Sequence, residues 1–176
     1  MRTTVISVIL LFLIVGGVFT AAAANETGNN SSAANKTVKG GGGGQPLSAI
    51  ILSLDVEPSS INLGTVYPDG IEKSYPNAVT ATVTYFLAWQ DTLSVRADGD
   101  LVNTADSSLT IPLSSLKFST PSLSKRSFTT SDQTIMTYTG GFFLPGSRSV
   151  TMSLYITVPP YTDPGTYQTT LIYTAT

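Results

Sequence analysis

The stretch that decides the fold class is Ala78-Val79-Thr80-Ala81-Thr82-Val83-Thr84-Tyr85-Phe86-Leu87-Ala88-Trp89, whose apolar side chains recur at every second residue. A β-strand sends successive side chains to opposite faces, whereas a helix would need apolar residues at steps of three and four. One face carries Val79, Ala81, Val83, Tyr85, Leu87 and Trp89, and the other carries threonines. One apolar face and one polar face are typical of an antiparallel sheet.

The same period of two continues on both sides of this stretch. It is clear in Ser48–Val56 and Val150–Val158, and further strands are expected at Ser60–Val66, Leu93–Ala97, Leu116–Ser119, Gln133–Thr139 and Tyr167–Thr174. Turn residues separate these segments: Pro68-Asp69-Gly70, Asp98-Gly99, Gly140-Gly141, Pro145-Gly146 and Asp163-Pro164-Gly165. We therefore expect residues 47–176 to form an all-β domain, an antiparallel two-sheet β-sandwich, with a closed barrel as the alternative.

The composition argues against catalysis and against nucleic-acid binding. The chain has no His and no Cys, so the commonest general base, thiolate nucleophiles and disulfides are absent. Its net charge is −2, without the stripe of Lys and Arg that a phosphate backbone requires. No Gly-x-Ser-x-Gly elbow occurs, and Asp55 and Glu57, which share one strand face, are interpreted as ordinary edge charges. We expect no enzyme activity, no cofactor and no nucleic-acid partner.

Residues 1–24 have the pattern of an export signal. Arg2 precedes the apolar run Val5–Ala24, which ends in alanines, and Ala22 and Ala24 fit cleavage before Asn25. The alternative is an uncleaved membrane-anchor helix, because about 20 apolar residues can span a bilayer. Both interpretations place the rest of the chain outside the cytoplasm, secreted or at the cell surface. The membrane would be a partner only through this segment, if it stays uncleaved.

Residues 25–46 are predicted to form a disordered, glycosylatable stalk. They contain almost no apolar side chain to bury, and Gly40–Gly44 is a flexible tether. Four N-x-Ser/Thr sequons fall here and none follows Leu47: Asn25, Asn29, Asn30 and Asn35.

Three short motifs resemble immunoglobulin-like extracellular domains. The segment from Leu54 to Val66, LDVEPSSINLGTV, resembles the opening strands of such surface modules. Trp89 followed by Leu93-Ser94-Val95 is similar to the tryptophan region of WxL-like cell-surface domains, and the tail from Val158 to Tyr173 resembles their final strand. The resemblance implies an immunoglobulin-like sandwich with an extracellular binding or structural role, and it fixes no ligand.

Two groups of side chains are weak candidates for sites. Four oxygen-bearing residues fall within one predicted inter-strand loop and could bind Ca²⁺: Asp98, Asp100, Asn103 and Asp106. Their spacing does not match an EF-hand, so a polar turn without metal is the favoured interpretation. Phe86, Phe142 and Phe143 form a possible contact surface, with closure of the core as the alternative for the last two, whereas Tyr85 and Trp89 are expected in the core.

One strand could serve assembly. Ser48–Val56 follows a flexible tether, so it can pair with its own sheet or complete the sheet of a neighbour. Its apolar row would fill the acceptor groove: Ile50, Leu52, Leu54 and Val56. The simpler alternative is the first strand of a monomeric sandwich.

Together these features predict a non-catalytic structural or adhesive surface protein, such as a filament or envelope subunit, whose partners are other copies of itself or envelope components. The alternative is a carbohydrate-binding module.

Overall fold

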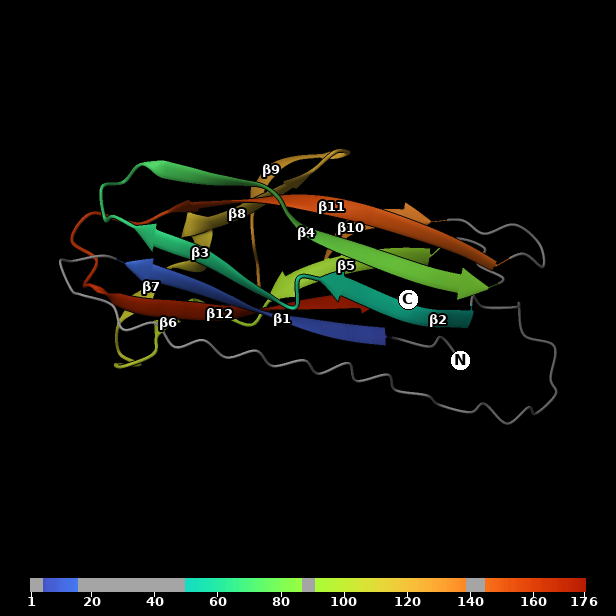
Figure 1. Cartoon of the computed structure of the whole chain (residues 1–176), viewed down its shortest axis with the longest axis horizontal. Helices are drawn as coiled ribbons and strands as arrows, with labels where there is room; N and C mark the ends of the chain where they lie inside the picture. Colours follow the sequence, from blue (N-terminus) through green and yellow to red (C-terminus); the bar gives the residue numbers. More distant parts are fainter. Residues whose placement is uncertain (1–4, 16–49, 87–90, 139–144) are drawn as a thin grey trace.

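The computed structural model describes residues 5–15, 50–86, 91–138 and 145–176, which form two β-sheets (Figure 1). Sheet A has the strand order β10 (Gln133–Tyr138), β5 (Asp91–Ala97), β12 (Gly165–Ala175), β1 (Val5–Val15) and β3 (Ser60–Val66), with β6 (Leu101–Asn103) and β7 (Thr110–Ile111) added beside β12. Sheet B has the order β2 (Ile50–Glu57), β4 (Glu72–Phe86), β11 (Pro145–Thr157), β8 (Leu116–Thr120) and β9 (Leu123–Ser127). A 3₁₀ turn, η1, covers Leu113–Ser115.

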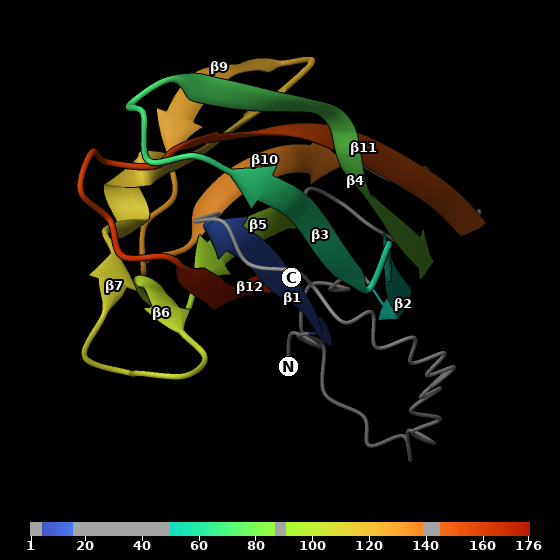
Figure 2. The same cartoon turned by 60° about the vertical axis from the view of Figure 1, so that its left-hand side comes forward.

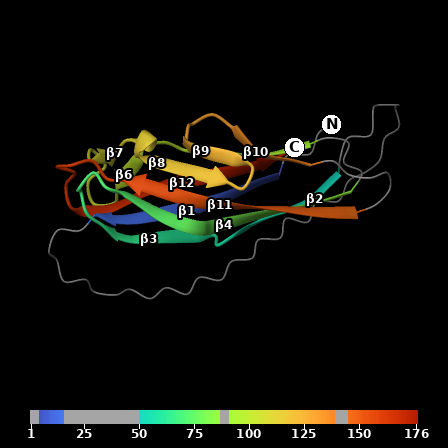
Figure 3. The same cartoon turned by 90° about the horizontal axis from the view of Figure 1, so that it is seen from above.

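The core lies between the inner faces of the two sheets, whose strands run along the long axis of the molecule (Figure 3). In β4, Val79, Ala81, Val83 and Tyr85 are buried, while the threonines between them are only half-buried. The alternation read from the sequence therefore predicts the faces correctly. The expected all-β architecture with two sheets is confirmed, and no strand pairing joins the two sheets into a barrel within the described residues.

Hydroxyl groups pair across the strands on the outer faces. Thr82 Oγ1 and Ser149 Oγ are 2.9 Å apart in sheet B, and Thr92 Oγ1 and Thr176 Oγ1 are 3.1 Å apart in sheet A. Such cross-strand pairs contribute a few tenths of a kcal/mol to about 1 kcal/mol each. They explain why a domain with so few charges still presents a polar surface.

Strand boundaries differ from the expectation where the alternation is interrupted. β4 begins at Glu72 rather than Ala78, because the strand continues through Asn77, whose φ is 51°, and its register with β11 shifts there. Pro145-Gly146 opens β11 instead of forming a turn. At Gly146 a Cβ atom would lie 2.7 Å from the Tyr85 ring, so this glycine is needed for close packing and not for a turn.

The N-terminal apolar run contributes a strand and not a helix where the structure describes it. Val5–Val15 forms β1, between β12 and β3 (Figures 1 and 2). It pairs antiparallel with β12 and parallel with β3, and the β1–β3 pair is the parallel one among the described ladders. Within the described residues no helix is long and apolar enough to cross a membrane. Cleavage before Asn25 stays a prediction, because residues 16–49 lie outside the described part.

The facing of β4 can be tested with two neighbouring substitutions. Val83 is 0% exposed, so Val83→Asp would bury an unpaired charge and should lower the free energy of unfolding by about 4 kcal/mol or more. Thr82→Asp changes a half-buried outer position and should cost about 1 kcal/mol. Urea unfolding of the purified chain measures both values, and equal losses would show that the facing is wrong.

Candidate functional site

The position of β1 inside sheet A is the feature with the clearest functional meaning. Eleven consecutive residues pair with β12, from Val5 opposite Ala175 to Val15 opposite Gly165. On the other side, Leu10 lies opposite Ser60 and Val15 opposite Val66 of β3. We call the space between β3 (Ser60–Val66) and β12 (Gly165–Ala175) the β3–β12 cleft. Without β1, both of its walls would be open strand edges.

The core side of the cleft is apolar. On β12, Tyr167, Leu171 and Tyr173 are each at most 1% exposed, and on β3 the buried residues are Ile61, Leu63 and Val66. Residues directly opposite each other on neighbouring strands lie on the same face of a sheet. The register pairs therefore assign these positions of β1 to the core face: Val5, Ser7, Ile9, Leu11, Leu13 and Val15.

One buried polar atom at the cleft has no partner among the described residues, the hydroxyl of Tyr173. Burial raises the pKa of this hydroxyl, so it stays neutral and able to donate a hydrogen bond. The hydroxyl of Tyr167, on the same strand, does have a partner: Tyr167 Oη donates a hydrogen bond to the Asp163 carbonyl oxygen at 2.9 Å. A buried hydroxyl without a partner is unfavourable by about 1–3 kcal/mol. The register position opposite Tyr173 is that of Ser7.

The outer side of the cleft is polar on β12 and apolar on β1. In the register of the two strands, the outer-face positions opposite the half-buried Gln168 and Thr166 are held by Phe12 and Ile14, both apolar in the sequence. A strand with one solvated face normally alternates apolar and polar residues. β1 therefore fits the core face of the cleft and not its outer face.

Exposed apolar side chains gather at one end of the cleft, where Val15, Val66 and Gly165 meet. Tyr67 follows directly after β3 and is 61% exposed, Ile71 is 58% exposed, and Tyr161 is 99% exposed. Their two turns are adjacent, because Gly70 N donates to the Val158 carbonyl at 3.1 Å. These three residues were not among the predicted site residues. The available sequence signal was a bulky apolar residue inside each Pro- and Gly-containing turn.

The predicted strand-donor residues belong to β2, at the edge of sheet B. Leu54 lies opposite Val83 and Val56 opposite Ala81, and Val56 is buried while Leu54 is half-buried. The register of β2 with β4 is interrupted between Ile51 and Ser53, so Leu52 has no partner in this ladder. Ile50 lies opposite Phe86, which is half-buried at the end of β4.

Three of the four residues of the calcium hypothesis accept hydrogen bonds from backbone N–H groups. Asp100 Oδ1 accepts from Leu113 N at 2.7 Å, Asn103 Oδ1 from Ala105 N at 2.8 Å, and Asp106 Oδ1 from Ser108 N at 2.9 Å, while Asp98 is exposed. Asn103 ends β6 and is buried, so it is not in a loop as expected. The described residues contain no group of three or more Asp, Glu, His or Cys suited to a metal. These contacts are those of polar turns.

The remaining candidates divide between the core and the undescribed part. Tyr85 is in the core, as expected, and stacks on Tyr138 with ring centroids 5.0 Å apart. Outside the described residues lie Trp89, Phe142, Phe143 and the sequon residues Asn25, Asn29, Asn30 and Asn35.

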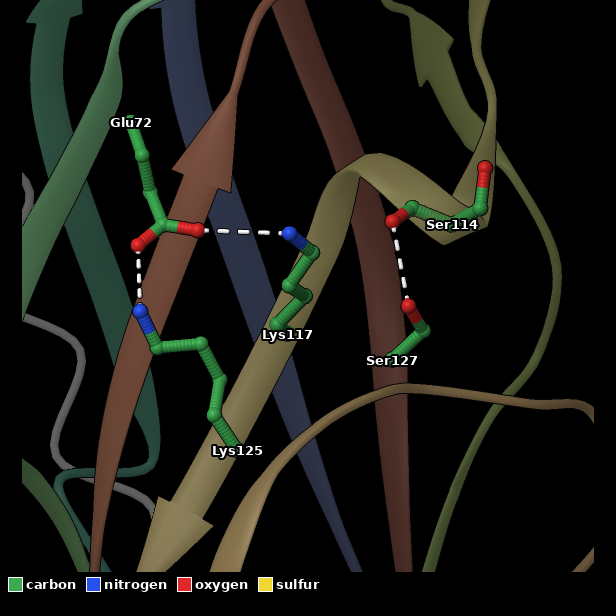
Figure 4. Close-up of polar contacts among 5 residues, drawn as sticks. All are labelled: Glu72, Ser114, Lys117, Lys125 and Ser127. Carbon is green, nitrogen blue, oxygen red and sulfur yellow. Dashed lines mark hydrogen bonds and ion pairs between the residues drawn. The ribbon is translucent and has the colours of Figure 1, made fainter.

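A charged cluster ties together the outer face of sheet B (Figure 4). The Glu72 carboxylate accepts hydrogen bonds from Lys117 Nζ at 3.3 Å and from Lys125 Nζ at 2.5 Å. Lys125 Nζ also lies 4.0 Å from the centroid of the Tyr155 ring, a cation–π contact. The side chains of Glu72, Lys117 and Lys125 are 31–41% exposed, so this is a solvated link between β4, β8, β9 and β11.

Comparisons with protein-family models, with curated proteins and with solved structures returned no match for this chain.

The Glu72 cluster predicts an acid dependence of stability. The hydrogen bond from Lys125 holds the pKa of the Glu72 carboxyl below its ordinary value of 4.5. When folding lowers the pKa of a carboxyl, its ionised form stabilises the fold at pH values above the pKa that the group has in the unfolded chain. This stabilisation is lost as the pH falls through the lower pKa of the folded state. Glu72→Gln should therefore lower the unfolding free energy by at most about 1 kcal/mol at pH 7 and by nothing once the pH is well below 4.5.

The measurement is urea unfolding of both proteins between pH 7 and pH 3. Glu57→Gln is the matched control, since Glu57 is exposed and has no ion pair among those described. A difference between Glu72→Gln and the parent chain that persists unchanged at pH 3 would contradict this assignment.

Proposed function

We propose that this chain is a non-catalytic structural subunit that is exported and self-associates outside the cell, secreted or at its surface. The observation that carries the proposal is the place of β1 in sheet A. This interior strand comes from the apolar run whose pattern is that of a cleavable export signal. A mature chain that begins at Asn25 would lack it, and the β3–β12 cleft would be open.

An open cleft of this kind favours association. The two strand edges would present unpaired N–H and C=O groups, and buried polar backbone groups without partners are strongly unfavourable. Between the edges, the buried Tyr167, Leu171 and Tyr173 would lose the neighbouring strand on one side. A strand added from outside satisfies both requirements at once, which is the physical basis of strand addition between proteins.

The polar side chains support a structural role over a catalytic one. The one described three-member cluster of ionised groups, Glu72 with Lys117 and Lys125, is a cross-link on the outer face of sheet B. The carbohydrate-binding alternative depends on an exposed aromatic row near Tyr85, and Tyr85 lies in the core.

Export and assembly are tested together in a host that secretes the protein. Mass spectrometry of the secreted chain should give an N-terminus at Asn25. Electron microscopy and sedimentation should show protease-resistant polymers, whereas a chain that retains residues 1–24 should remain largely monomeric because β1 fills its own cleft. A mature chain that stays monomeric at high concentration with one cooperative melting transition would overturn the proposal.

A further inference from the structure

We propose that the β3–β12 cleft of the mature subunit accepts strand β2, Ile50–Glu57, from a second copy of the chain. This inference rests on the proposed function and deepens it by naming the acceptor and the donor. In the precursor, β1 holds the position that the donated strand takes after export.

The two segments carry the same residues at alternate positions. Ser7–Val15 reads SVILLFLIV and Ser48–Val56 reads SAIILSLDV. At every second position both have Ser, Ile, Leu, Leu and Val, in that order. In β1 these are Ser7, Ile9, Leu11, Leu13 and Val15, all of which lie at core-face positions of the cleft. The donor strand can therefore present to the core of the cleft the side-chain types that β1 places there.

The positions between these residues favour the donor over β1. Phe12 and Ile14 of β1 correspond to Ser53 and Asp55 of β2. Phe12 and Ile14 lie opposite Gln168 and Thr166 on the outer face of sheet A. Ser53 and Asp55 are polar at these two positions, as a solvated face of a sheet requires. The match also extends to Ser48, which corresponds to Ser7, the residue opposite Tyr173, whose hydroxyl has no partner among the described residues.

A chain cannot place its own β2 in this position. In the matched register Val56 would lie where Val15 lies, beside Val66, and Ile51 would lie where Leu10 lies, beside Ser60. The start of β3 would then be about 17 Å from Val56, whereas the four residue steps from Val56 to Ser60 reach about 14 Å. Neighbouring parallel strands generally need a crossover of about a dozen residues. The donor must therefore come from another copy.

β2 is poorly placed in its own sheet, which makes it available. Among the described strands it pairs only with β4, at the edge of sheet B, and its ladder is interrupted at Leu52. In the cleft it would pair on both sides, continuously with β12 and, as β1 does between Phe12 and Ile14, with one register shift against β3. The exchange replaces one ladder, with β4, by two ladders, with β3 and with β12.

The body of the donor subunit would also meet an apolar surface. The donated strand ends where Val15 ends in β1, so the donor continues from Val56 into its own β3 beside Val66 and Gly165 of the acceptor. Tyr67, Ile71 and Tyr161 are exposed at this end of the acceptor. Contact with a second copy would cover them, which gives a reason for such large apolar side chains in turns.

Engineered disulfides test the register in a chain that has no other cysteine. In the matched register Ser53 of the donor lies opposite Gln168 of the acceptor, the partner of Phe12 in β1. Mature chains carrying Ser53→Cys and Gln168→Cys should form a ladder of disulfide-linked multimers on a non-reducing gel, which reductant collapses. The matched control carries Ser53→Cys and Thr84→Cys, because Ser53 lies opposite Thr84 when β2 stays in its own sheet.

Three outcomes separate this inference from the proposed function. Polymers with cross-links through Gln168 and without cross-links through Thr84 support the inference. If polymers form but the only disulfides are those that Ser53→Cys and Thr84→Cys make inside single chains, the inference is overturned and the proposed function still stands. A mature chain that forms no polymer overturns both.

A second pair of variants tests the facing of the donated strand. Leu52→Asp would bury a charge on the core face of the cleft, so it should reduce the polymer yield at least about tenfold. Ser53→Asp changes the outer face and should reduce it less than about twofold. A free peptide of residues 48–57 should block polymerisation of the parent chain, and the same peptide with Leu52→Asp should not. Equal effects of the two variants would contradict the proposed facing.

Discussion

The structure depends on what lies beside β12. This strand, Gly165–Ala175, is in the middle of sheet A, and the buried Tyr167, Leu171 and Tyr173 project from it into the core. Along its whole length it pairs with β1, and it also pairs with β5 and β6. A central strand cannot leave one edge unpaired without exposing backbone groups and core together. Every arrangement of this domain must therefore supply a strand at the β1 position, with an apolar residue at nearly every second place.

Strict alternation made most of the fold predictable from the sequence. The expected strand Ser60–Val66 has the observed bounds, and the strand expected at Tyr167–Thr174 lies within β12. β9 was missed because its residues are mostly exposed and carry no apolar period, and β7 because two residues give no period at all. β1 could not be predicted as a strand because it has too many apolar residues, whereas β9 and β7 have too few. An apolar residue at almost every position contains no alternation, so its pattern indicates an export signal and says nothing about the face it presents.

In the candidate site too, one part could be predicted from local sequence and the other could not. The donor strand was a prediction from the sequence, since a tethered, alternating segment can be read from local pattern alone, and it stays a prediction. It could not identify the acceptor, because the β3–β12 cleft brings together residues about a hundred positions apart in the chain. Such non-local pairings carry no local signal. The calcium hypothesis failed to gain support for a related reason: sequence spacing placed Asp100 and Asn103 in one loop, and their side chains are engaged separately, with Leu113 N and Ala105 N.

In the proposed assembly, the order of the strands fixes the form of the polymer. The donor segment, β2, directly precedes β3, and β3 is itself one wall of the cleft that receives the next donor. Each subunit therefore gives a strand and accepts a strand through different surfaces. A head-to-tail contact of this kind builds a closed ring where the subunits come round to one another and an open filament where they do not. The link between donor and body, Glu57-Pro58-Ser59, is short, so neighbouring subunits would be held in close contact. The shared alternate residues of β1 and β2 then have one physical explanation: both segments are shaped by the same cleft, one before export and the other after it.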